Sequence, residues 1–302
     1  MSLSADVWPL RSMLFVPGQK PDWIQKASKY HPDALIIDLE DAVPPGEKEA
    51  ARLTTLDGIA FCQSVGLPAT VRINPPNAGG LEDIHVVASP GLVAVVVPKL
   101  RTVEEVRAVD HALCYAEGRA GMPLGSIGVI LIPETAEGLR DAGLLALASS
   151  RVKGIMGGFS AAVIGDIARA VGFRPTHEGS EQHYLASKLV LDSQAAGAFF
   201  PVCVIVGTRI DDLEAVRELV SRARQFGFTG CALIHPSHVA VANQVFMPTS
   251  QEIEYASGLI AAVENGESTG SGAVLYQGMM VDYAMVPSAK ATMREAARRG
   301  LR

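Results

Sequence analysis

The sequence predicts an α/β protein that folds as a (β/α)8 TIM barrel with a small C-terminal helical and hairpin appendage. Eight short apolar runs, rich in β-branched residues, recur along the chain, and a helical segment follows each of them. Apolar strands that alternate with helices in this way are typical of a closed parallel sheet. With 302 residues, 48% of them hydrophobic, the chain can build one large core.

The alternative fold is a doubly wound open sheet, which often carries a glycine-rich phosphate loop. The turn VPGQKP after the first expected strand lacks the spacing GxGxxG, and the motif GxxxxGK(S/T) occurs nowhere. The sequence therefore favours the barrel. Its strands are expected at SMLFVPG, Ala34–Leu39, ATVRINP, LVAVVVPKL, IGVILIP, Val152–Gly157, PVCVIV and GCALIHP.

Residues 1–246 are predicted to form the barrel, and residues 247–302 an appendage that packs on the barrel or on a neighbouring subunit. Barrel helices are expected at Pro21–Tyr30, Glu47–Val65, from Thr102 to about Glu117, Glu181–Ala196 and Asp211–Phe226. The appendage is expected to contain a helix at Ser250–Val263, the flexible linker NGESTGSG, a hairpin around Gln277–Gly278 and a last helix at about Ser288–Arg299.

Composition excludes several classes of protein. The net charge of −6 offers no basic face for nucleic acid, and no apolar run approaches the ~20 residues of a membrane span. The first residues, a loose segment, lack the charged start and apolar core of a signal peptide. Four cysteines without a CxxC pair indicate free thiols rather than disulfides or a zinc site. We therefore expect a cytoplasmic protein.

Polar side chains gather where the expected strands end, and in a barrel these ends form one rim. They are Asp38, Glu40 and Asp41 (second strand), Arg72 (third), Lys99 (fourth), Glu134 (fifth), Ser160 (sixth) and His235 (eighth). Carboxylates without thiolates or a close histidine pair suit an oxygen-loving ion such as Mg²⁺. Such an ion would act as a Lewis acid on a carbonyl group.

Each of these residues also has a purely structural interpretation. Glu134 could simply favour the dipole of the next helix. Arg72 could bind a substrate carboxylate or a developing oxyanion, or it could form an internal salt bridge with Asp38 or Asp41. His235 could donate a hydrogen bond to substrate or cap a helix.

The segment Gly157–Ser160 is expected at the N-terminus of a helix, where it could cradle a carboxylate or a phosphate. The alternative is a plain helix cap by Ser160. The same segment also resembles a nucleophile elbow with its last glycine replaced, and Asp211 and His235 follow in the order of a hydrolase triad. The oxyanion-loop motif of such hydrolases is absent.

Seven motifs in order resemble the HpcH/HpaI aldolase/citrate lyase family, and within it the citrate lyase β-subunit-like and malyl-CoA lyase-like proteins. They are RSMLFVPGQKPDWIQKA, IIDLEDAVPPGEKEAAR, VRIN, VVVPK, IPETAEGL, LIHPSHV and GSGAVLYQGMMVD. The resemblance implies a (β/α)8 barrel, usually trimeric, that cleaves or forms a carbon–carbon bond in CoA thioesters of hydroxy acids.

The resemblance also implies roles for single residues. Arg72 matches the arginine that binds the keto acid, such as oxaloacetate or glyoxylate, and Glu134 matches the first Mg²⁺ ligand. Asp282 is similar to an aspartate that reaches into a neighbouring subunit's site as acid or base. Three further positions lie near the CoA or substrate entrance in the family: Phe15, Lys20, which stands where arginine is common, and Lys26.

One departure from the family matters. The family motif resembles G-x-E-D-L, whose Asp is the second Mg²⁺ ligand, but this chain has Phe159 and Ser160 in place of the two acids. The leading hypothesis is a Mg²⁺-assisted lyase acting on citryl-CoA, malyl-CoA, citramalyl-CoA or a similar thioester. In it, Arg72 and the amides around Gly158 hold the keto acid. The second hypothesis is a barrel that binds CoA or a keto acid without turnover.

Overall fold

The computed structural model describes residues 7–301, so the first part of the predicted loose N-terminal segment lies outside the described residues. Contacts divide the chain into two compact units, Met1–Val245 and Phe246–Arg302. The first unit contains all the strands of the predicted barrel.

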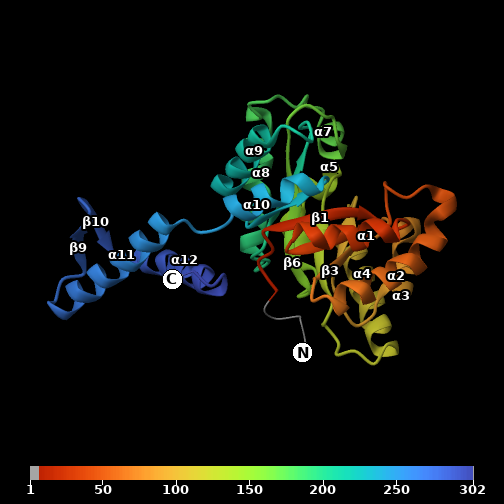
Figure 1. Cartoon of the computed structure of the whole chain (residues 1–302), viewed down its shortest axis with the longest axis horizontal. Helices are drawn as coiled ribbons and strands as arrows, with labels where there is room; N and C mark the ends of the chain where they lie inside the picture. Colours follow the sequence, from red (N-terminus) through yellow and green to blue (C-terminus); the bar gives the residue numbers. More distant parts are fainter. Residues whose placement is uncertain (1–6, 302) are drawn as a thin grey trace. The chain divides into compact units, whose positions relative to one another are not determined.

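Eight parallel strands close into a barrel in the order β1 to β8, which confirms the predicted fold class (Figure 1). Closure pairs β1 with β8, where Ser12 lies opposite Cys231 and Leu14 opposite Leu233. The strands are β1 (Ser12–Pro17), β2 (Ala34–Asp38), β3 (Ala69–Arg72), β4 (Leu92–Pro98), β5 (Gly128–Ile132), β6 (Val152–Ser160), β7 (Val202–Val206) and β8 (Gly230–Leu233).

Helices lie between successive strands and after β8, and they surround the barrel (Figure 1). They are α1 (Pro21–Ala27), α2 (Lys48–Ser64), α3 (Leu81–Val87), α4 (Val103–Arg119), α5 (Ala136–Arg140), α6 (Ala142–Leu147), α7 (Asp166–Val171), α8 (His183–Ala195), α9 (Leu213–Phe226) and α10 (Val239–Val245). The helices expected with stated bounds are present with ends shifted by a few residues, whereas no bounds were predicted for the short helices α3, α5, α6, α7 and α10. Helices of about two turns contain too few residues to show a 3.6-residue period.

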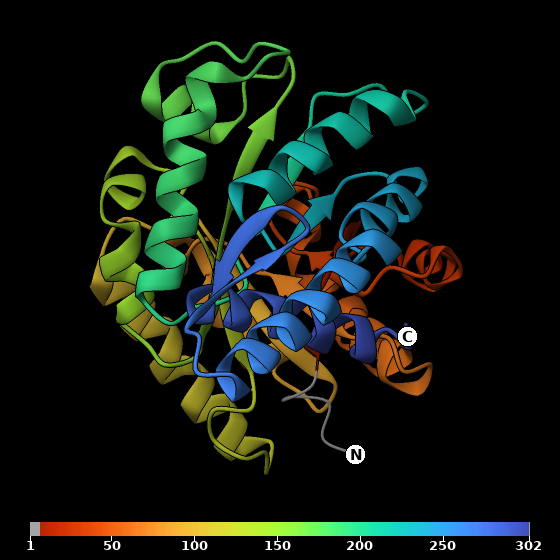
Figure 2. The ribbon, with the colours of Figure 1, turned by 90° about the vertical axis from the view of Figure 1, so that its left-hand side faces the viewer.

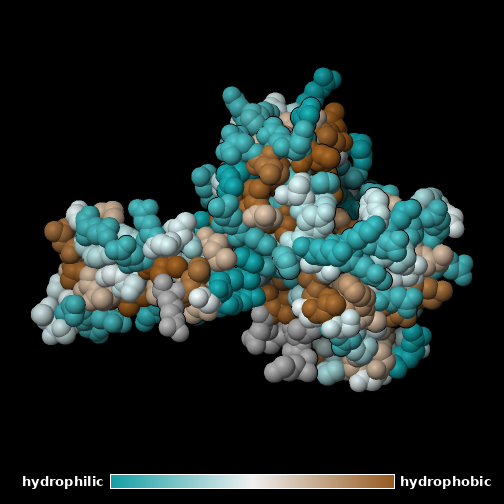
Figure 3. All heavy atoms as spheres, viewed as in Figure 1, coloured by the Kyte–Doolittle hydropathy of each residue, from teal (hydrophilic) through white to brown (hydrophobic). Residues whose placement is uncertain are grey.

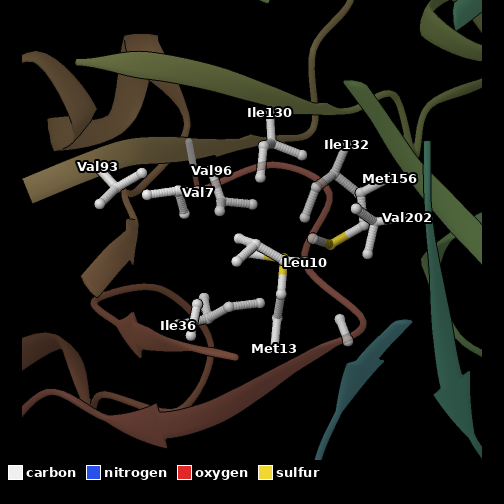
Figure 4. Close-up of a cluster of buried hydrophobic side chains, with 12 residues drawn as sticks. Val7, Leu10, Met13, Ile36, Val93, Val96, Ile130, Ile132, Met156 and Val202 are labelled. Carbon is white, nitrogen blue, oxygen red and sulfur yellow. The ribbon is translucent and has the colours of Figure 1, made fainter. Parts of the chain in front are cut away.

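Apolar side chains fill the barrel interior. Leu10 and Met13 lie among inward-facing residues of β2, β4, β5, β6 and β7, such as Ile36 and Ile130 (Figure 4). Val7 and Leu10 precede β1, so the segment before the first strand contributes to this core. Layers of branched side chains of this kind make a barrel a packed core rather than a pore. Ligands therefore meet the barrel at its ends.

The second unit contains α11 (Ser250–Ser268), β9 (Ala273–Tyr276), β10 (Met279–Asp282) and α12 (Val286–Arg298), and the two strands form the predicted antiparallel hairpin. Figure 2 shows the hairpin beside α11. The predicted linker NGESTGSG is partly wrong, because Asn265 to Ser268 continue α11. A reciprocal capping box between Thr249 and Glu252 stabilises the N-terminus of α11.

The surface of the barrel unit is mostly hydrophilic, but apolar residues gather near α7, where Val163, Ile164 and Val171 are exposed (Figure 3). Cys62, Cys203 and Cys231 are buried as free thiols. None of the helices in the described part of the chain combines the length and the apolar character that crossing a membrane requires.

Candidate functional site

A cavity of about 610 Å³ opens at the C-terminal end of the barrel strands. Its lining combines apolar wall residues with the polar side chains Asp38, Arg72, Glu134 and His235. Asp38 and Arg72 are the last residues of β2 and β3, and Glu134 follows β5 by two residues. The barrel therefore brings together at one rim residues that are widely separated in sequence, as the sequence pattern predicts.

Arg72 is held from two sides by carboxylates. Its Nε and Nη2 atoms lie 2.7 and 2.5 Å from the two carboxylate oxygens of Asp38, and its Nη1 lies 2.9 Å from Oε2 of Glu40. The ring of Phe15 lies 4.9 Å from the guanidinium carbon, which is a cation–π distance. Burial opposes the charge, but the hydrogen bonds and charge of Asp38, together with Glu40, hold the pKa of Arg72 above its ordinary value. The alternative of an internal salt bridge with Asp38 is thus realised in the structure.

Glu40 links Arg72 to Lys99. The Lys99 ammonium lies 2.5 Å from Oε1 of Glu40 and 3.1 Å from Asp41. Burial raises the pKa of Glu40, and the charge of Asp41 adds to this effect, against the opposing influence of Arg72 and Lys99. Lys99 has a positive φ of 54°, a strained conformation for a residue with a side chain and one found more often near functional sites.

Asp38 also shapes the loop that carries these acids. Its two oxygens accept hydrogen bonds from the backbone N–H groups of Glu40 and Ala42, at 2.9 and 3.2 Å. A carboxylate that accepts from the backbone and from Arg72 has a fixed orientation, so Asp38 sets the direction of the guanidinium. Asp38 thus lines the cavity and Glu40 contacts Arg72, whereas Asp41 pairs with Lys99 and not with Arg72.

Among the described residues, Oε1 of Glu134 and both carboxylate oxygens of Glu40 are buried without a hydrogen-bond partner, but the oxygens of Glu40 form ion pairs with Arg72 and Lys99. Burial, with the charges of Glu40 and Asp166, raises the pKa of Glu134 to about 8, and the opposing charges of Arg72 and Lys99 do not compensate. The first turn of α5 has its own cap, since the Thr135 hydroxyl accepts from the backbone N–H of Gly138. The interpretation of Glu134 as only a helix-dipole residue does not explain its buried, unpaired oxygen.

The structure corrects the prediction for Gly157–Ser160. These residues are the end of β6 and not the start of a helix, since α7 begins only at Asp166. A Cβ at Gly158 would lie 2.5 Å from the Cys203 sulfur and 2.7 Å from the Val204 nitrogen, so Gly158 is needed for close pairing with β7. The proposed cradle of helix N-terminal amides around Gly158 and Ser160 is therefore wrong.

Ser160 uses its hydroxyl locally. The Oγ atom donates to the Val163 carbonyl at 2.6 Å and accepts from the Val163 N–H at 3.1 Å. The other members of the possible hydrolase triad also have separate partners: Asp211 pairs with Arg209, and Nδ1 of His235 lies 2.7 Å from the Ser237 hydroxyl. The contacts of these three side chains give no support to a serine nucleophile.

The residues predicted around the cavity entrance are distributed unevenly. Lys26 lines the cavity together with Trp23 from the same helix, α1, whereas Lys20 is an exposed residue at the start of that helix and is absent from the cavity lining. The ring of His235 caps the turn at Pro236 and also lines the cavity, and its hydrogen bond to substrate stays a prediction.

Asp282 ends β10 in the second unit, where its side chain accepts a hydrogen bond from the backbone N–H of Ala284 at 2.9 Å. Its predicted role across a subunit boundary stays a prediction.

Sequence reasoning missed Asp166. This residue, the first of α7, lines a second hollow of about 360 Å³ together with Glu134 and Lys99. Glu134 therefore borders both hollows. An acid at the start of the segment DIARAV was the available signal, but an acid in the first turn of a helix is so common that it does not indicate a site.

The donor set fits a divalent cation bound partly by substrate. Among the described residues, no three His, Cys, Asp or Glu side chains lie close enough to hold a metal ion by themselves. Glu134 nevertheless presents a buried oxygen without a partner, and its neighbours Glu40 and Asp166 add negative charge. An oxygen-ligated ion such as Mg²⁺ needs only one or two protein carboxylates when water and substrate oxygens complete its shell.

A closed parallel barrel whose charged side chains meet at the C-terminal strand ends has the architecture of a (β/α)8 enzyme. The family model for HpcH/HpaI aldolase/citrate lyase matches residues 11–236, and the chain belongs to this family. A citrate lyase subunit beta from Haemophilus influenzae is 30% identical over 293 residues, which cover 97% of this chain and 98% of that protein.

An L-malyl-CoA/beta-methylmalyl-CoA lyase from Cereibacter sphaeroides is 31% identical over 309 residues, which cover 95% of each chain. A solved structure of a citrate lyase beta subunit from Mycobacterium tuberculosis, complexed with oxaloacetate and magnesium, matches with a TM-score of 0.62 and 25% identity. The match covers 80% of this chain and 99% of that one.

Proposed function

We propose that the protein is a carbon–carbon lyase that acts, with Mg²⁺, on the CoA thioester of a hydroxy acid and releases a keto acid. The observation that carries this proposal is the buried, unpaired oxygen of Glu134 in the same cavity as Arg72. Family membership and the malyl-CoA lyase among the relatives support the class of substrate. The oxaloacetate and magnesium bound by a solved relative support the keto acid and the ion.

In the reaction, the substrate hydroxyl loses its proton and its oxygen becomes the keto oxygen. The bond between the two product fragments breaks, and its electron pair moves to the carbon next to the thioester, which takes up a proton. Mg²⁺, when bound, supplies Lewis-acid polarisation of the oxygen that becomes the keto group. Glu134 is the protein residue that would hold it.

Arg72 binds the carboxylate of the keto-acid portion. A guanidinium has five N–H groups, and two of those of Arg72 donate to Asp38, which leaves three that could reach a substrate carboxylate; two of these three are on Nη1, which also forms an ion pair with Glu40. Because Asp38 fixes the guanidinium and Phe15 covers it, Arg72 presents these donors in one direction. Lys26, on the exposed side of the cavity, provides positive charge for the phosphates of CoA.

Asp282 from a second subunit is proposed as the acid that delivers the proton to the thioester carbon. The second unit places Asp282 at the end of a hairpin strand, where its carboxylate is partly accessible.

The second candidate is a barrel that binds CoA or a keto acid without turnover. It is favoured by one observation: the hydroxyl of Ser160, the residue that the sequence resemblance sets against the family's metal-binding aspartate, is hydrogen-bonded to the backbone of Val163. A neutral hydroxyl that already donates to and accepts from Val163 is a poor substitute for a carboxylate on Mg²⁺.

The test is a panel of CoA thioesters of 3-hydroxy acids, including malyl-CoA, citramalyl-CoA and citryl-CoA, with keto-acid release as the readout. We expect Mg²⁺-dependent release from at least one thioester. The isosteric variant Glu134→Gln should lower this rate by about 100-fold or more, because one charge-stabilising contact contributes on that scale. The matched control is Glu214→Gln, an exposed glutamate in the first turn of α9 that lies outside the cavity linings.

Binding of keto acid or CoA without turnover of any thioester would support the second candidate instead. An unchanged rate in Glu134→Gln would exclude Glu134 from the machinery.

A further inference from the structure

We infer that His235 donates a hydrogen bond from Nε2 to the thioester oxygen of the substrate and stabilises the enolate that forms when the carbon–carbon bond breaks. This inference rests on the proposed lyase function and assigns a catalytic residue to it. In that function the electron pair moves to the carbon next to the thioester, so the thioester oxygen shares the negative charge. The proposed roles of Arg72, Glu134 and Asp282 leave this oxygen without a donor.

His235 lies on the side of the cavity where CoA is expected. It follows β8, the strand that closes the barrel by pairing with β1. The helix after β1, α1, carries Lys26, which the proposed function assigns to CoA, and both residues line the 610 Å³ cavity. Arg72 and Glu134, the residues for the keto acid and the cation, belong to the ends of β3 and β5. The thioester, which joins the two parts of the substrate, is therefore expected within reach of His235.

The contacts of Nδ1 determine where the neutral ring carries its hydrogen. The backbone N–H of Ser237 donates to Nδ1 of His235 at 3.3 Å, and the Ser237 hydroxyl lies 2.7 Å from the same nitrogen. The hydroxyl can rotate between Nδ1 and the carbonyl oxygen of Ile210, 2.9 Å away, but the direction of the backbone N–H is fixed. Nδ1 is therefore an acceptor, and the hydrogen of the neutral ring is on Nε2.

The second ring nitrogen, Nε2, is available for a ligand. Among the described residues, no group forms a hydrogen bond with Nε2 of His235, and this atom is not one of the buried polar atoms. Ser237 contacts the other nitrogen through both its N–H and its hydroxyl, so the ring has a fixed orientation. A donor that is oriented before charge develops needs no reorganisation during the reaction, which is the condition for strong stabilisation of an oxyanion.

A second histidine, His238, lies beside this ring. It is 1% exposed, and its ring centre lies 5.7 Å from that of His235. Burial lowers the pKa of His238, and the charge of His235 adds to this effect, against the opposing influence of the Ile210 backbone. His238 is therefore an uncharged neighbour near pH 7. A hydrogen bond beside a buried, uncharged ring is less screened than one in water.

Two substitutions at His235 separate the donor from the helix cap. Asparagine is a good N-cap residue and places an acceptor near the position of Nδ1, but it has no donor at the position of Nε2. Glutamine places an amide N–H near the position of Nε2 but no acceptor at that of Nδ1. A residue that only caps the turn would tolerate asparagine better than glutamine, whereas an oxyanion donor would show the reverse order.

The measurement is the cleavage rate of the thioester that the wild type accepts from the panel. We expect His235→Asn to lower kcat about 100-fold and to change KM less than about threefold, because the donor acts mainly in the transition state. His235→Gln should keep at least about a tenth of the wild-type kcat. The matched control is His111→Gln, an exposed histidine of α4 outside the cavity linings, and circular dichroism checks that each variant is folded.

The position of the ring hydrogen is measured separately in the unliganded full chain, so this readout does not depend on turnover. Imidazole ¹⁵N chemical shifts of labelled histidines, assigned with His235→Gln, should show the hydrogen of His235 on Nε2 at about pH 8, where neutral imidazole predominates.

A hydrogen on Nδ1, a wild-type kcat in His235→Asn, or an equal or greater loss in His235→Gln would overturn the inference while the lyase function stands. If the wild type cleaves no thioester of the panel, the lyase function is wrong and the inference is wrong with it.

Discussion

At the scale of single residues, Glu134 connects the electrostatics of the site to the stability of the protein. Burial and the nearby acids Glu40 and Asp166 raise its pKa from 4.5 to about 8, although Arg72 and Lys99 oppose this change. Between these two pH values the folded protein keeps a proton on Glu134 that the unfolded chain has released. Folding stability therefore decreases as the pH rises through this interval.

The variant Glu134→Gln cannot ionise, so it should lack this part of the pH dependence. In metal-free buffer we expect it to be more stable than the wild type at pH 8, by about 1 kcal/mol or more, and to differ little at pH 4.5. Urea unfolding at the two pH values measures the difference. Parallel profiles for the wild type and Glu134→Gln would show that Glu134 ionises normally, and Glu137→Gln is the exposed control.

Sequence reasoning identified Arg72 and Glu134 because polar residues interrupt apolar patterns at strand ends. It could not decide how Arg72 is used, because that depends on the loop that carries Asp38 and Glu40 and on its hydrogen bonds. Asp166 was not predicted as a site residue, because its proximity to Glu134 depends on the position of α7 relative to the end of β5 and not on any local sequence pattern.

At the scale of elements, β6 shows how tertiary contacts override local propensity. Glycine pairs usually interrupt strands, so the pattern predicted an end at Gly157. The strand continues to Ser160 because Gly157 to Ser160 pair in register with Cys203 to Val206 of β7. Gly158, which the pattern interprets as a strand breaker, is the residue whose missing side chain permits the close approach of β6 to β7.

Gly158→Ala tests this explanation. An added Cβ would lie 2.5 Å from the Cys203 sulfur and 2.7 Å from a backbone nitrogen, so β6 or β7 must move. We expect a loss of about 1–3 kcal/mol in the free energy of unfolding, measured with urea. Gly165→Ala is the matched control, since a Cβ there meets no atom within 4 Å. An equal effect in both variants would contradict the close-approach explanation.

Other elements were predictable because one pattern dominates each. Apolar runs predicted the eight strands, and Thr102 predicted the start of α4, where the structure shows a reciprocal capping box with Glu105. The extension of α11 beyond Val263 was not predicted, because Asn265 and Gly266 disfavour helix locally. Gly266 is buried there, and a Cβ would meet Val274 of the hairpin at 2.3 Å, so packing against β9 explains the longer helix.

At the scale of the whole molecule, the barrel and the second unit have separate cores. Ala256, Leu259, Val263, Val281 and Ala289 form a cluster within the second unit alone. A unit with its own core can keep its internal structure while it binds another subunit. This property is compatible with the proposal that Asp282 acts in the site of a neighbouring barrel. We propose a homo-oligomer, with a trimer favoured, as the assembly that would do this.

Subunit mixing tests the proposed role of Asp282. Pure Glu134→Gln and pure Asp282→Asn should both lack turnover, while Asp282→Asn should still bind keto acid. Refolding an equal mixture should restore roughly a quarter of wild-type activity, since a site then needs one intact barrel and one intact neighbour. The readout is lyase rate per subunit, with the oligomer checked by light scattering.

No recovery in the mixture would indicate that Asp282 acts within its own subunit. Full activity in pure Asp282→Asn would remove it from the reaction altogether.

Barrel closure has a consequence for how the protein is made. The contact between Arg11, beside β1, and Cys231 of β8 joins residues 220 positions apart in sequence. A ribosome adds about 5–20 residues per second. The strand β1 therefore leaves the ribosome on the order of ten seconds or more before β8, its second neighbour in the barrel, has been synthesised. Until then the growing sheet has two open edges, and nascent chains on neighbouring ribosomes offer strands of the same sequence to both.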